Sequence, residues 1–280
     1  MGRPEYADSA SIAAPVGLMQ NGGFESRGIP MRLALLSDIH ANLQALDACL
    51  EHAQAQRAQR YAFLGDLVGY GADPVAVVDR VMQLVEEGAV AIKGNHDAMA
   101  VAPPQQVSTV GDTTAYWTHI QLSPARRAWL DALPLTVHEE SVLLVHASVN
   151  EPELWRYVYD ERGASASLDA SSAWAGVRYV FGGHVHRQTL YYRGAADDLM
   201  MFVPQAGVAI PVPRHRQWLA TVGSVGQPRD GKPLAMYALF DTERARLTFH
   251  RVAYDHHSAA AAIRRAGLPD YFAARLEAGL

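Results

Sequence analysis

Acidic and imidazole side chains occur in five short blocks, and each block ends a short apolar run of the chain. The blocks are Asp38-Ile39-His40, Gly65-Asp66, Gly94-Asn95-His96-Asp97, the single His146, and Gly182-Gly183-His184-Val185-His186. Carboxylate, imidazole and amide ligands in one set suit Mn, Fe, Zn or Co rather than a purely oxygen-seeking ion such as calcium. These groups are too many for one tetrahedral ion, but two ions that share a bridging carboxylate would use them all. The blocks therefore predict a two-metal centre of the kind used in phosphoryl transfer.

The cysteine content narrows the choice of ligands. The chain has 280 residues, with twelve histidines but a single cysteine, Cys49. One cysteine excludes an internal disulfide framework, a four-cysteine zinc site and a Cys-x-x-Cys redox pair. A metal centre here must therefore use nitrogen and oxygen ligands. Seven histidines lie outside the blocks, and we interpret them as surface or packing residues: His52, His119, His138, His215, His250, His256 and His257.

Short apolar strands and amphipathic helices alternate through the first third of the chain. We expect strands at residues 32–37, 61–64 and 89–93, and helices between them at residues 42–57 and 74–88. This alternation predicts a largely parallel sheet with right-handed crossovers. Because open α/β sheets place their sites at the carboxyl ends of strands, blocks far apart in sequence can converge there. We also interpret Asp38-x-His40 and His184-x-His186 as extended i, i+2 pairs that point both side chains the same way.

The rest of the chain continues as strands and helices without an internal repeat. We expect helices at residues 112–121, 123–133, 255–267 and 269–277, and strands at residues 135–139, 142–146, 177–182, 189–193, 200–203, 218–222, 235–241 and 247–252. Residues 147–170 show no clear period and are predicted to form a long loop with short helices. Trp155, Tyr157 and Tyr159 in this loop are interpreted as local core, and a platform for stacking bases stays open as an alternative if the substrate is a nucleotide. Residues 31–280 are expected to form one domain after a disordered N-terminal extension over residues 1–30.

Composition and charge limit the kinds of partner that the protein can have. Hydrophobic residues make up 49% of the chain and the formal net charge is -5, which is typical of a water-soluble globular protein without a strongly basic surface. A dedicated nucleic-acid binder is therefore not expected. No apolar run reaches the roughly 18–20 residues that span a bilayer. We expect a cytoplasmic protein that acts on a small molecule, and its oligomeric state stays open.

The five blocks in this order resemble the calcineurin-like metallophosphoesterase superfamily. The match runs from about Met31 to Asp241, and the longer strings D-I-H-A-N-L-Q-A-L, G-D-L-V-G-Y-G-A-D-P and G-S-V-G-Q-P-R-D-G resemble its bacterial branch of phosphodiesterases and diadenosine tetraphosphatases. Each block alone is a weak signal, whereas five blocks in order are a strong one. The resemblance implies an α/β fold, a four-layer α/β/β/α sandwich of two mixed sheets.

The resemblance also assigns a role to each block residue. It implies one metal held by Asp38, His40, Asp66 and His186, and a second held by Asp66, Asn95, His146 and His184. Asp66 would bridge two divalent ions, among which manganese is favoured over Fe, Zn or Co. His96 would be the proton donor to the leaving group, oriented by Asp97, and a metal-bridging hydroxide would be the nucleophile.

Two departures from the family pattern bear on the substrate. Protein phosphatases of this superfamily read G-D-x-V-D-R-G, whereas this chain has Gly69-Tyr70-Gly71 at the corresponding place, and Ala98 to Ala100 follow the third block without an arginine. Two arginines that would clamp a dianionic phosphate are therefore missing. This favours a phosphodiester or nucleotide substrate.

Three further residues are candidates for substrate contact, although each also has a structural interpretation. They are Asn42, which would otherwise cap a helix, Tyr70, which would otherwise pack on the rim, and Arg229, which would otherwise occupy a turn. Three alternative functions stay open at this point: a phosphomonoesterase or protein serine/threonine phosphatase, a non-catalytic scaffold of the same fold, and a nuclease.

Overall fold

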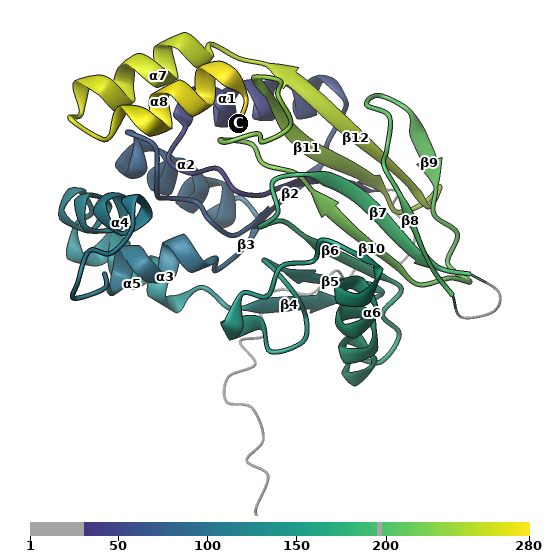
Figure 1. Cartoon of the computed structure of the whole chain (residues 1–280). Coiled ribbons are helices and arrows are strands. Elements are labelled where there is room, and N and C mark those ends of the chain that lie inside the picture. Colours follow the sequence, from purple (N-terminus) through teal and green to yellow (C-terminus); the bar gives the residue numbers. More distant parts are fainter. Residues whose placement is uncertain (1–30, 195–197) are drawn as a thin grey trace, which may run out of the picture.

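The structure, a computed structural model, describes residues 31–194 and 198–280. The predicted extension over residues 1–30 lies outside the described residues. Two mixed sheets of six strands each, flanked by helices, confirm the predicted fold class (Figure 1). None of the helices in the described residues is long and apolar enough to cross a membrane.

The first sheet has the strand order β3-β2-β1-β11-β12-β9 (Figure 1). Its strands are β1 (Arg32–Leu36), β2 (Arg60–Leu64), β3 (Val90–Ile92), β9 (Ala209–Pro211), β11 (Leu234–Asp241) and β12 (Arg246–Ala253). β1 pairs in parallel with β2, and β2 with β3, as the alternation of strands and helices predicted. The other three strands add on in antiparallel pairs. The parallel half of the sheet therefore delivers three strand ends to one edge.

The second sheet has the strand order β4-β5-β6-β10-β7-β8. Its strands are β4 (Thr136–Glu139), β5 (Val142–Val145), β6 (Tyr179–Gly182), β7 (Gln188–Arg193), β8 (Leu199–Phe202) and β10 (Trp218–Val222). β5, β6 and β10 are parallel neighbours, while β4, β7 and β8 run antiparallel to theirs. The chain continues from the ends of β5 and β6 into His146 and His184, so this sheet delivers the remaining blocks.

Eight α-helices and two short 3-10 helices complete the described part of the chain. They are α1 (Leu43–Ala55), α2 (Pro74–Glu86), α3 (Asn95–Val101), α4 (Val110–Gln121), α5 (Pro124–Ala132), α6 (Glu161–Ala170), α7 (His256–Arg265), α8 (Asp270–Ala278), η1 (Pro152–Leu154) and η2 (Ser171–Ala173). Local chemistry sets several of the boundaries. Asn42 accepts a hydrogen bond from the Ala45 amide and so caps α1, and Ser123 caps α5 in the same way. Pro74 opens α2, where its missing N–H costs nothing.

Alternation along the strands sends side chains into different layers. Leu33 and Leu35 of β1 pack between the two sheets, whereas Ala34 and Leu36 pack against the helices on the outer face of the first sheet. Helices α1, α2, α7 and α8 cover that outer face, and α6 covers the second sheet. Cys49 is buried among these helices, as expected. The four layers place both sets of strand ends at the same end of the sandwich.

Three elements were not predicted: α3, which begins at the third block itself, the three-residue strand β9 and the 3-10 helix η2. Short helices were expected within residues 147–170, and one of them, α6, is ten residues long. α6 is rich in alanine and serine, and its buried face consists of Ala164, Ser167 and Leu168. That face is too weakly apolar to produce a clear helical period.

Candidate metal centre

Five of the seven candidate ligands lie on backbone in the left-handed conformation. The backbone φ angles are 54° at Asp38, 49° at His40, 52° at Asp66, 67° at His184 and 54° at His186. The extended i, i+2 arrangement predicted for the two D-x-H and H-x-H pairs is therefore wrong. Non-glycine residues adopt this conformation at a cost of roughly 1–2 kcal/mol each. The surrounding loops must hold the backbone there, and such strain is typical of functional sites.

Close packing of the loops holds this backbone in place. The amides of Asp38 and His40 donate to the carbonyls of Gly65 and Asp66, which joins the first block to the second. Gly94 lies against Asp66 so closely that a Cβ at this position would overlap the Asp66 carboxylate. Only glycine allows the third block to lie this close to the second.

A first cluster joins Asp38 with two histidines. The Nε2 atoms of His40 and His186 lie 3.1 Å apart. The Asp38 Oδ1 atom lies 3.2 Å from His186 Nε2 and 3.9 Å from His40 Nε2. All three side chains are almost completely buried. They belong to the first and fifth blocks, which are more than 140 residues apart in sequence.

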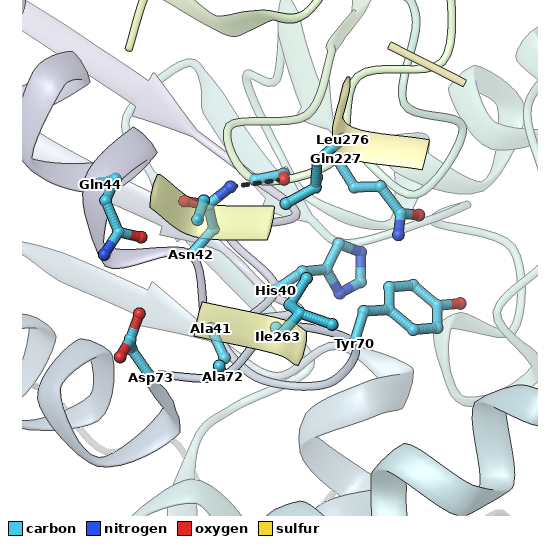
Figure 2. A pocket seen from close by; sticks show the side chains of 13 residues that line it. His40, Ala41, Asn42, Gln44, Tyr70, Ala72, Asp73, Gln227, Ile263 and Leu276 are labelled. Carbon is cyan, nitrogen blue, oxygen red and sulfur yellow. Dashed lines mark hydrogen bonds between the residues drawn. The ribbon is translucent and has the colours of Figure 1, made fainter. Parts of the chain in front are cut away.

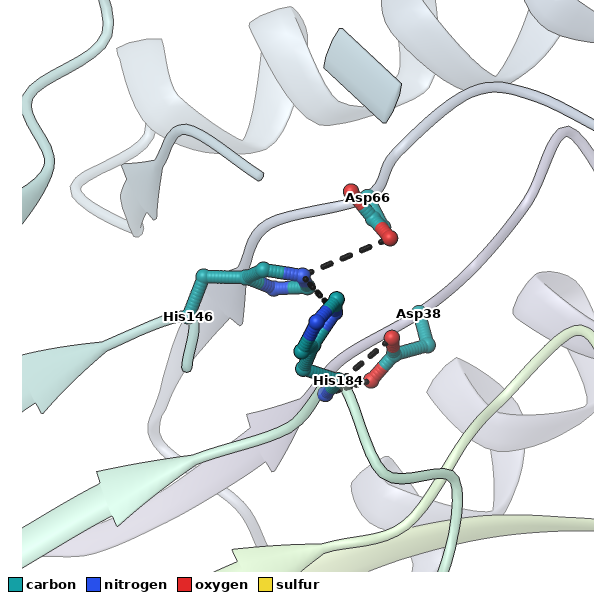
Figure 3. Close-up of side chains that lie close together, drawn as sticks. All are labelled: Asp38, Asp66, His146 and His184. Atoms are coloured by element: carbon teal, nitrogen blue, oxygen red, sulfur yellow. Dashed lines mark hydrogen bonds and ion pairs between the residues drawn. The ribbon is translucent and has the colours of Figure 1, made fainter. Parts of the chain in front are cut away.

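A second cluster surrounds His146 (Figure 3). Its Nε2 atom lies 3.3 Å from Asp66 Oδ2, 3.2 Å from Asn95 Oδ1 and 3.2 Å from His184 Nδ1. The backbone amide of His184 also donates to Asp38, which links the two clusters. One ligand atom each from Asp38, Asp66, His146 and His184 lies within 4.8 Å of the others, and the same limit holds for Asp38, His40 and His186. All seven predicted ligands thus lie close together. Asp38 and Asp66 both lie between the two clusters.

Backbone carbonyls fix which ring nitrogen of three histidines faces the cluster. The Nδ1 atoms of His40, His146 and His186 contact the carbonyl oxygens of Val68, Leu64 and Gln227 at 3.3, 2.7 and 2.6 Å. A carbonyl only accepts, so each Nδ1 carries a proton, and each Nε2 faces the cluster and presents a lone pair when its ring is neutral. Nitrogen and oxygen atoms thus lie about 3 Å apart across the site, where a proton or a metal ion between them would stabilise the arrangement. Such outer hydrogen bonds are also the usual way in which metal-binding histidines are oriented.

The charges of the site point to the same requirement. The ion-pair partners of Asp38 and Asp66 in the described part of the chain are all histidines. Burial opposes ionisation of Asp66, but His146 and His96 outweigh it and hold the pKa of Asp66 well below its usual value. Burial likewise disfavours the cation of His146, yet the Asp66 carboxylate raises the pKa of His146 to about 9. Buried carboxylates need positive charge beside them, and these residues would hold it as a proton or a metal ion.

His96 lies beside these two clusters, and one of its ring nitrogens is within 4.8 Å of ligand atoms of His40 and Asp66. Its ring packs against His40 and Tyr70, with ring centroids 5.1 and 4.3 Å away, and its Nδ1 atom has no hydrogen-bond partner among the described residues. Its backbone amide donates to Asp66 Oδ1, which leaves Oδ2 to face His146. Burial lowers the pKa of the His96 ring, against the opposing effect of Asp66.

Asp97 was predicted to orient the His96 ring, but the hydrogen-bond partners of its carboxylate are backbone amides. Its carboxylate accepts hydrogen bonds from the backbone amides of Leu67, Val68 and Gly94. No described hydrogen bond joins it to His96. Asp97 therefore holds the loop after β2 against the start of α3, and it acts on the site through the position of that loop.

The three predicted substrate contacts have different surroundings. Asn42 uses both ends of its amide, since Oδ1 caps α1 and Nδ2 donates to the Gly226 carbonyl at 2.9 Å, so a structural role accounts for it. Figure 2 shows it in the wall of a pocket beside His40 and Tyr70. Tyr70 packs its ring on His40, with centroids 4.5 Å apart.

Arg229 is a basic side chain close to Tyr70. Its guanidinium donates to Gln227 Oε1 at 2.8 Å, and the Gln227 carbonyl in turn contacts His186. Burial raises the pKa of Tyr70 to about 12, and Arg229 is close enough to oppose that rise. The loop after β10 thus supports a candidate ligand and brings a guanidinium to the same place. The carbonyls of Leu64, Val68 and Gln227 were not predicted, because a backbone carbonyl has no signature in sequence.

Comparisons with known proteins agree with this geometry. The model of the calcineurin-like phosphoesterase superfamily domain matches residues 31–245. The crystal structure of a metallophosphoesterase from Sphaerobacter thermophilus is similar, with 33% sequence identity, a TM-score of 0.78, and coverage of 90% of this chain and 100% of that one. A hypothetical protein, PH1004 from Pyrococcus horikoshii, shares the fold at 18% identity with a TM-score of 0.70, covering 89% and 99% of the two chains.

Two curated relatives were also found. An uncharacterized protein of Methanocaldococcus jannaschii, MJ0912, is 29% identical over 253 residues, which cover 88% of this chain and 98% of the relative. A symmetrical bis(5'-nucleosyl)-tetraphosphatase of Ralstonia nicotianae is 38% identical over 90 residues, about a third of each chain. The family model spans most of the chain and includes all five blocks. The protein belongs to the calcineurin-like phosphoesterase superfamily, a family of hydrolases.

Proposed function

We propose that this chain is a dinuclear metal-dependent phosphodiesterase that acts on a nucleotide-type substrate. The observation that carries the proposal is the convergence of buried imidazole nitrogens and carboxylate oxygens from five strand ends. His40 and His186 face each other at 3.1 Å while backbone carbonyls hold their Nδ1 protons. A protein would not bury these groups together without a cation to bind.

The chain's own residues would divide the work as follows. Asp38, His40, Asp66 and His186 would hold one ion, and Asp66, Asn95, His146 and His184 the other. Two divalent ions, manganese in the first instance, would supply an activated water molecule and positive charge for the phosphate. The buried ring of His96 lies 5.1 Å from that of His40, where it could donate a proton to a leaving oxygen. Arg229 and Tyr70 would contact the phosphate oxygens at the rim.

The preference for a diester rests on the number of guanidinium groups. A phosphomonoester is a dianion and favours two bidentate arginine contacts, whereas a diester carries one charge. Both family arginines are absent here, and Arg229 is a basic residue placed at the rim. The tetraphosphatase relative, named for a nucleotide substrate, supports a nucleotide over a phosphoprotein.

The test combines metal analysis with kinetics on the full chain. The protein is loaded with Mn²⁺, and hydrolysis of bis(p-nitrophenyl) phosphate, p-nitrophenyl phosphate and dinucleoside polyphosphates is compared. We expect two ions per chain and faster turnover of the diester than of the monoester. Asp66→Asn should lower occupancy of both ions, whereas Asp79→Asn, on the exposed face of α2, should leave them unchanged.

Three outcomes would contradict the proposal. Faster hydrolysis of the monoester would favour a phosphomonoesterase. Full metal loading without hydrolysis of any phosphoester would favour a non-catalytic scaffold. Two fully occupied ions in Asp66→Asn would refute the bridging role of this carboxylate.

A further inference from the structure

The segment between η1 and α6 places three aromatic side chains beside the candidate metal centre. The Trp155 ring meets the ring of His146 edge to face, with centroids 5.9 Å apart. The Tyr157 ring is stacked on His184 at 4.0 Å with an interplanar angle of 15°. Tyr159 is stacked on Tyr157 at 4.9 Å with an angle of 11°. The interpretation of these residues as local core is wrong for both tyrosines, because their side chains are 48% and 57% exposed.

His184, Tyr157 and Tyr159 form what we call the aromatic ladder. Tyr157 stacks on both of the other rings, and no ring contact joins His184 to Tyr159 among the described residues. Tyr157 therefore lies between them, and the ladder leads from a candidate ligand outward to solvent. Tyr159 is the outermost ring and has no further ring partner in the described part of the chain.

Packing alone does not account for the ladder. Tyr157 can serve the fold by covering His184, but Tyr159 contacts no candidate ligand and leaves more than half of its surface in water. The two stacked rings, each about half exposed, leave an aromatic face open to a planar group beside a polar site. Between them, Val158 is buried in the core beside α6, which anchors the segment and sets the direction of both tyrosines.

We propose that the aromatic ladder binds the nucleobase of the substrate, with Tyr159 as the outer stacking surface. This assignment rests on the proposed function, since it places the phosphate at the metal centre. A flat π-face beside a phosphate site accepts any base without reading its edge. The geometry agrees with this placement, because the Tyr157 ring is stacked on the candidate ligand His184 at 4.0 Å and the ladder therefore begins at the phosphate site. One substrate could thus contact the ligands and Arg229 with its phosphate and the ladder with its base.

The experiment compares two ligands that differ by the base. Adenosine monophosphate and ribose 5-phosphate are titrated into the metal-loaded full chain by calorimetry. Stacking of one base on an aromatic side chain typically changes affinity by about 5- to 100-fold, so the nucleotide should bind that much more tightly. Tyr159→Leu should bring this ratio close to one and leave the Kd of ribose 5-phosphate unchanged. Tyr159→Phe should keep the ratio.

A matched control uses a tyrosine elsewhere on the surface. Tyr116 on α4 is 57% exposed, like Tyr159, and Tyr116→Leu should keep the ratio of the wild-type protein. An unchanged ratio in Tyr159→Leu, or equal affinity of the two ligands for the wild type, would overturn the proposal. If the ratio behaves as expected but no phosphoester is hydrolysed, the proposed function fails and the nucleobase site stands.

Discussion

The carboxylate of Asp97 offers a sharp test of how the site is held together. It is fully buried, and it accepts hydrogen bonds at 2.9 Å from Leu67, 3.3 Å from Val68 and 2.9 Å from Gly94. Asp97→Asn replaces one of its oxygens with an NH₂ group. That group would face a backbone N–H, because all three partners are donors.

The cost follows from these contacts. One charge-assisted hydrogen bond is worth roughly 1.5–3 kcal/mol, and a buried donor left without an acceptor adds to the loss. The other two bonds persist but lose the charge of the carboxylate. Burial and the neighbouring Asp66 raise the pKa of Asp97 to about 7, so its bonds are charge-assisted only above that pH and the cost of burying the charge offsets part of the loss. We therefore expect Asp97→Asn to lower the free energy of unfolding at pH 8 by about 1–3 kcal/mol. Because Asp97 holds the loop that carries Asp66, metal affinity should fall as well.

Urea unfolding of metal-free protein, followed by circular dichroism, measures the stability. Asp112→Asn is the control, because Asp112 accepts comparable hydrogen bonds from Ser108 and Thr109 in the capping box of α4. This variant should have a smaller effect on stability and none on metal affinity. The reasoning is refuted if Asp97→Asn is as stable as the wild type. It is also refuted if this variant loses activity only on substrates with poor leaving groups, because that pattern would mean that Asp97 acts through His96.

Three further predictions concern individual side chains. His96→Ala should keep both ions but lose about 10²–10⁴-fold in kcat on alkyl phosphodiesters and much less on p-nitrophenyl esters. An equal loss of kcat on the two kinds of substrate would exclude a proton-donor role. Arg229→Gln should raise KM for a diester about 10- to 100-fold, which corresponds to the loss of one charged hydrogen bond. Arg229→Lys should give a KM between those of the wild type and Arg229→Gln. Burial and the neighbouring His52 lower the pKa of His250 to about 4, so the unfolded chain binds a proton between about pH 6.5 and 4 that the folded chain does not. The free energy of unfolding should therefore fall as the pH drops through this window. Between pH 8 and pH 5, His250→Phe should remove at most about 2 kcal/mol of this loss. Urea unfolding of both proteins at the two pH values measures the difference.

The sequence predicted the parallel strands and the convergence of the five blocks because both depend on simple patterns, whereas the four layers were implied by the resemblance to the family. Apolar runs of four to six residues mark buried strands, and the polar groups directly after them mark the edge where parallel strands end. Asp38, Asp66 and His146 could therefore be placed together without any knowledge of their distances. Asn42 and Ser123 were predictable as caps for a similar reason, since their role depends on neighbours three residues away.

The features that were missed or misread depend on contacts that have no local signature. Nothing in Asp38-x-His40 distinguishes a left-handed backbone from an extended one, and the loops that impose it come from elsewhere in the chain. The partner of Asp97 could not be predicted either, because backbone amides of the preceding block bind its carboxylate. The exposure of Tyr157 and Tyr159 depends on where η1 and α6 place the segment, and aromatic residues are more often buried than exposed.

The left-handed backbone of the ligands has a consequence for how this protein can be altered. At Asp38, His40, Asp66, His184 and His186, glycine would relax the chain, yet glycine offers no ligand atom. The relief of backbone strain, about 1–2 kcal/mol at each position, would oppose the cost of the cavity that the buried side chain leaves. A glycine at one of these positions would therefore change the melting temperature less than an ordinary truncation in the core, although it removes a candidate ligand, so a melting curve is a poor test of this site.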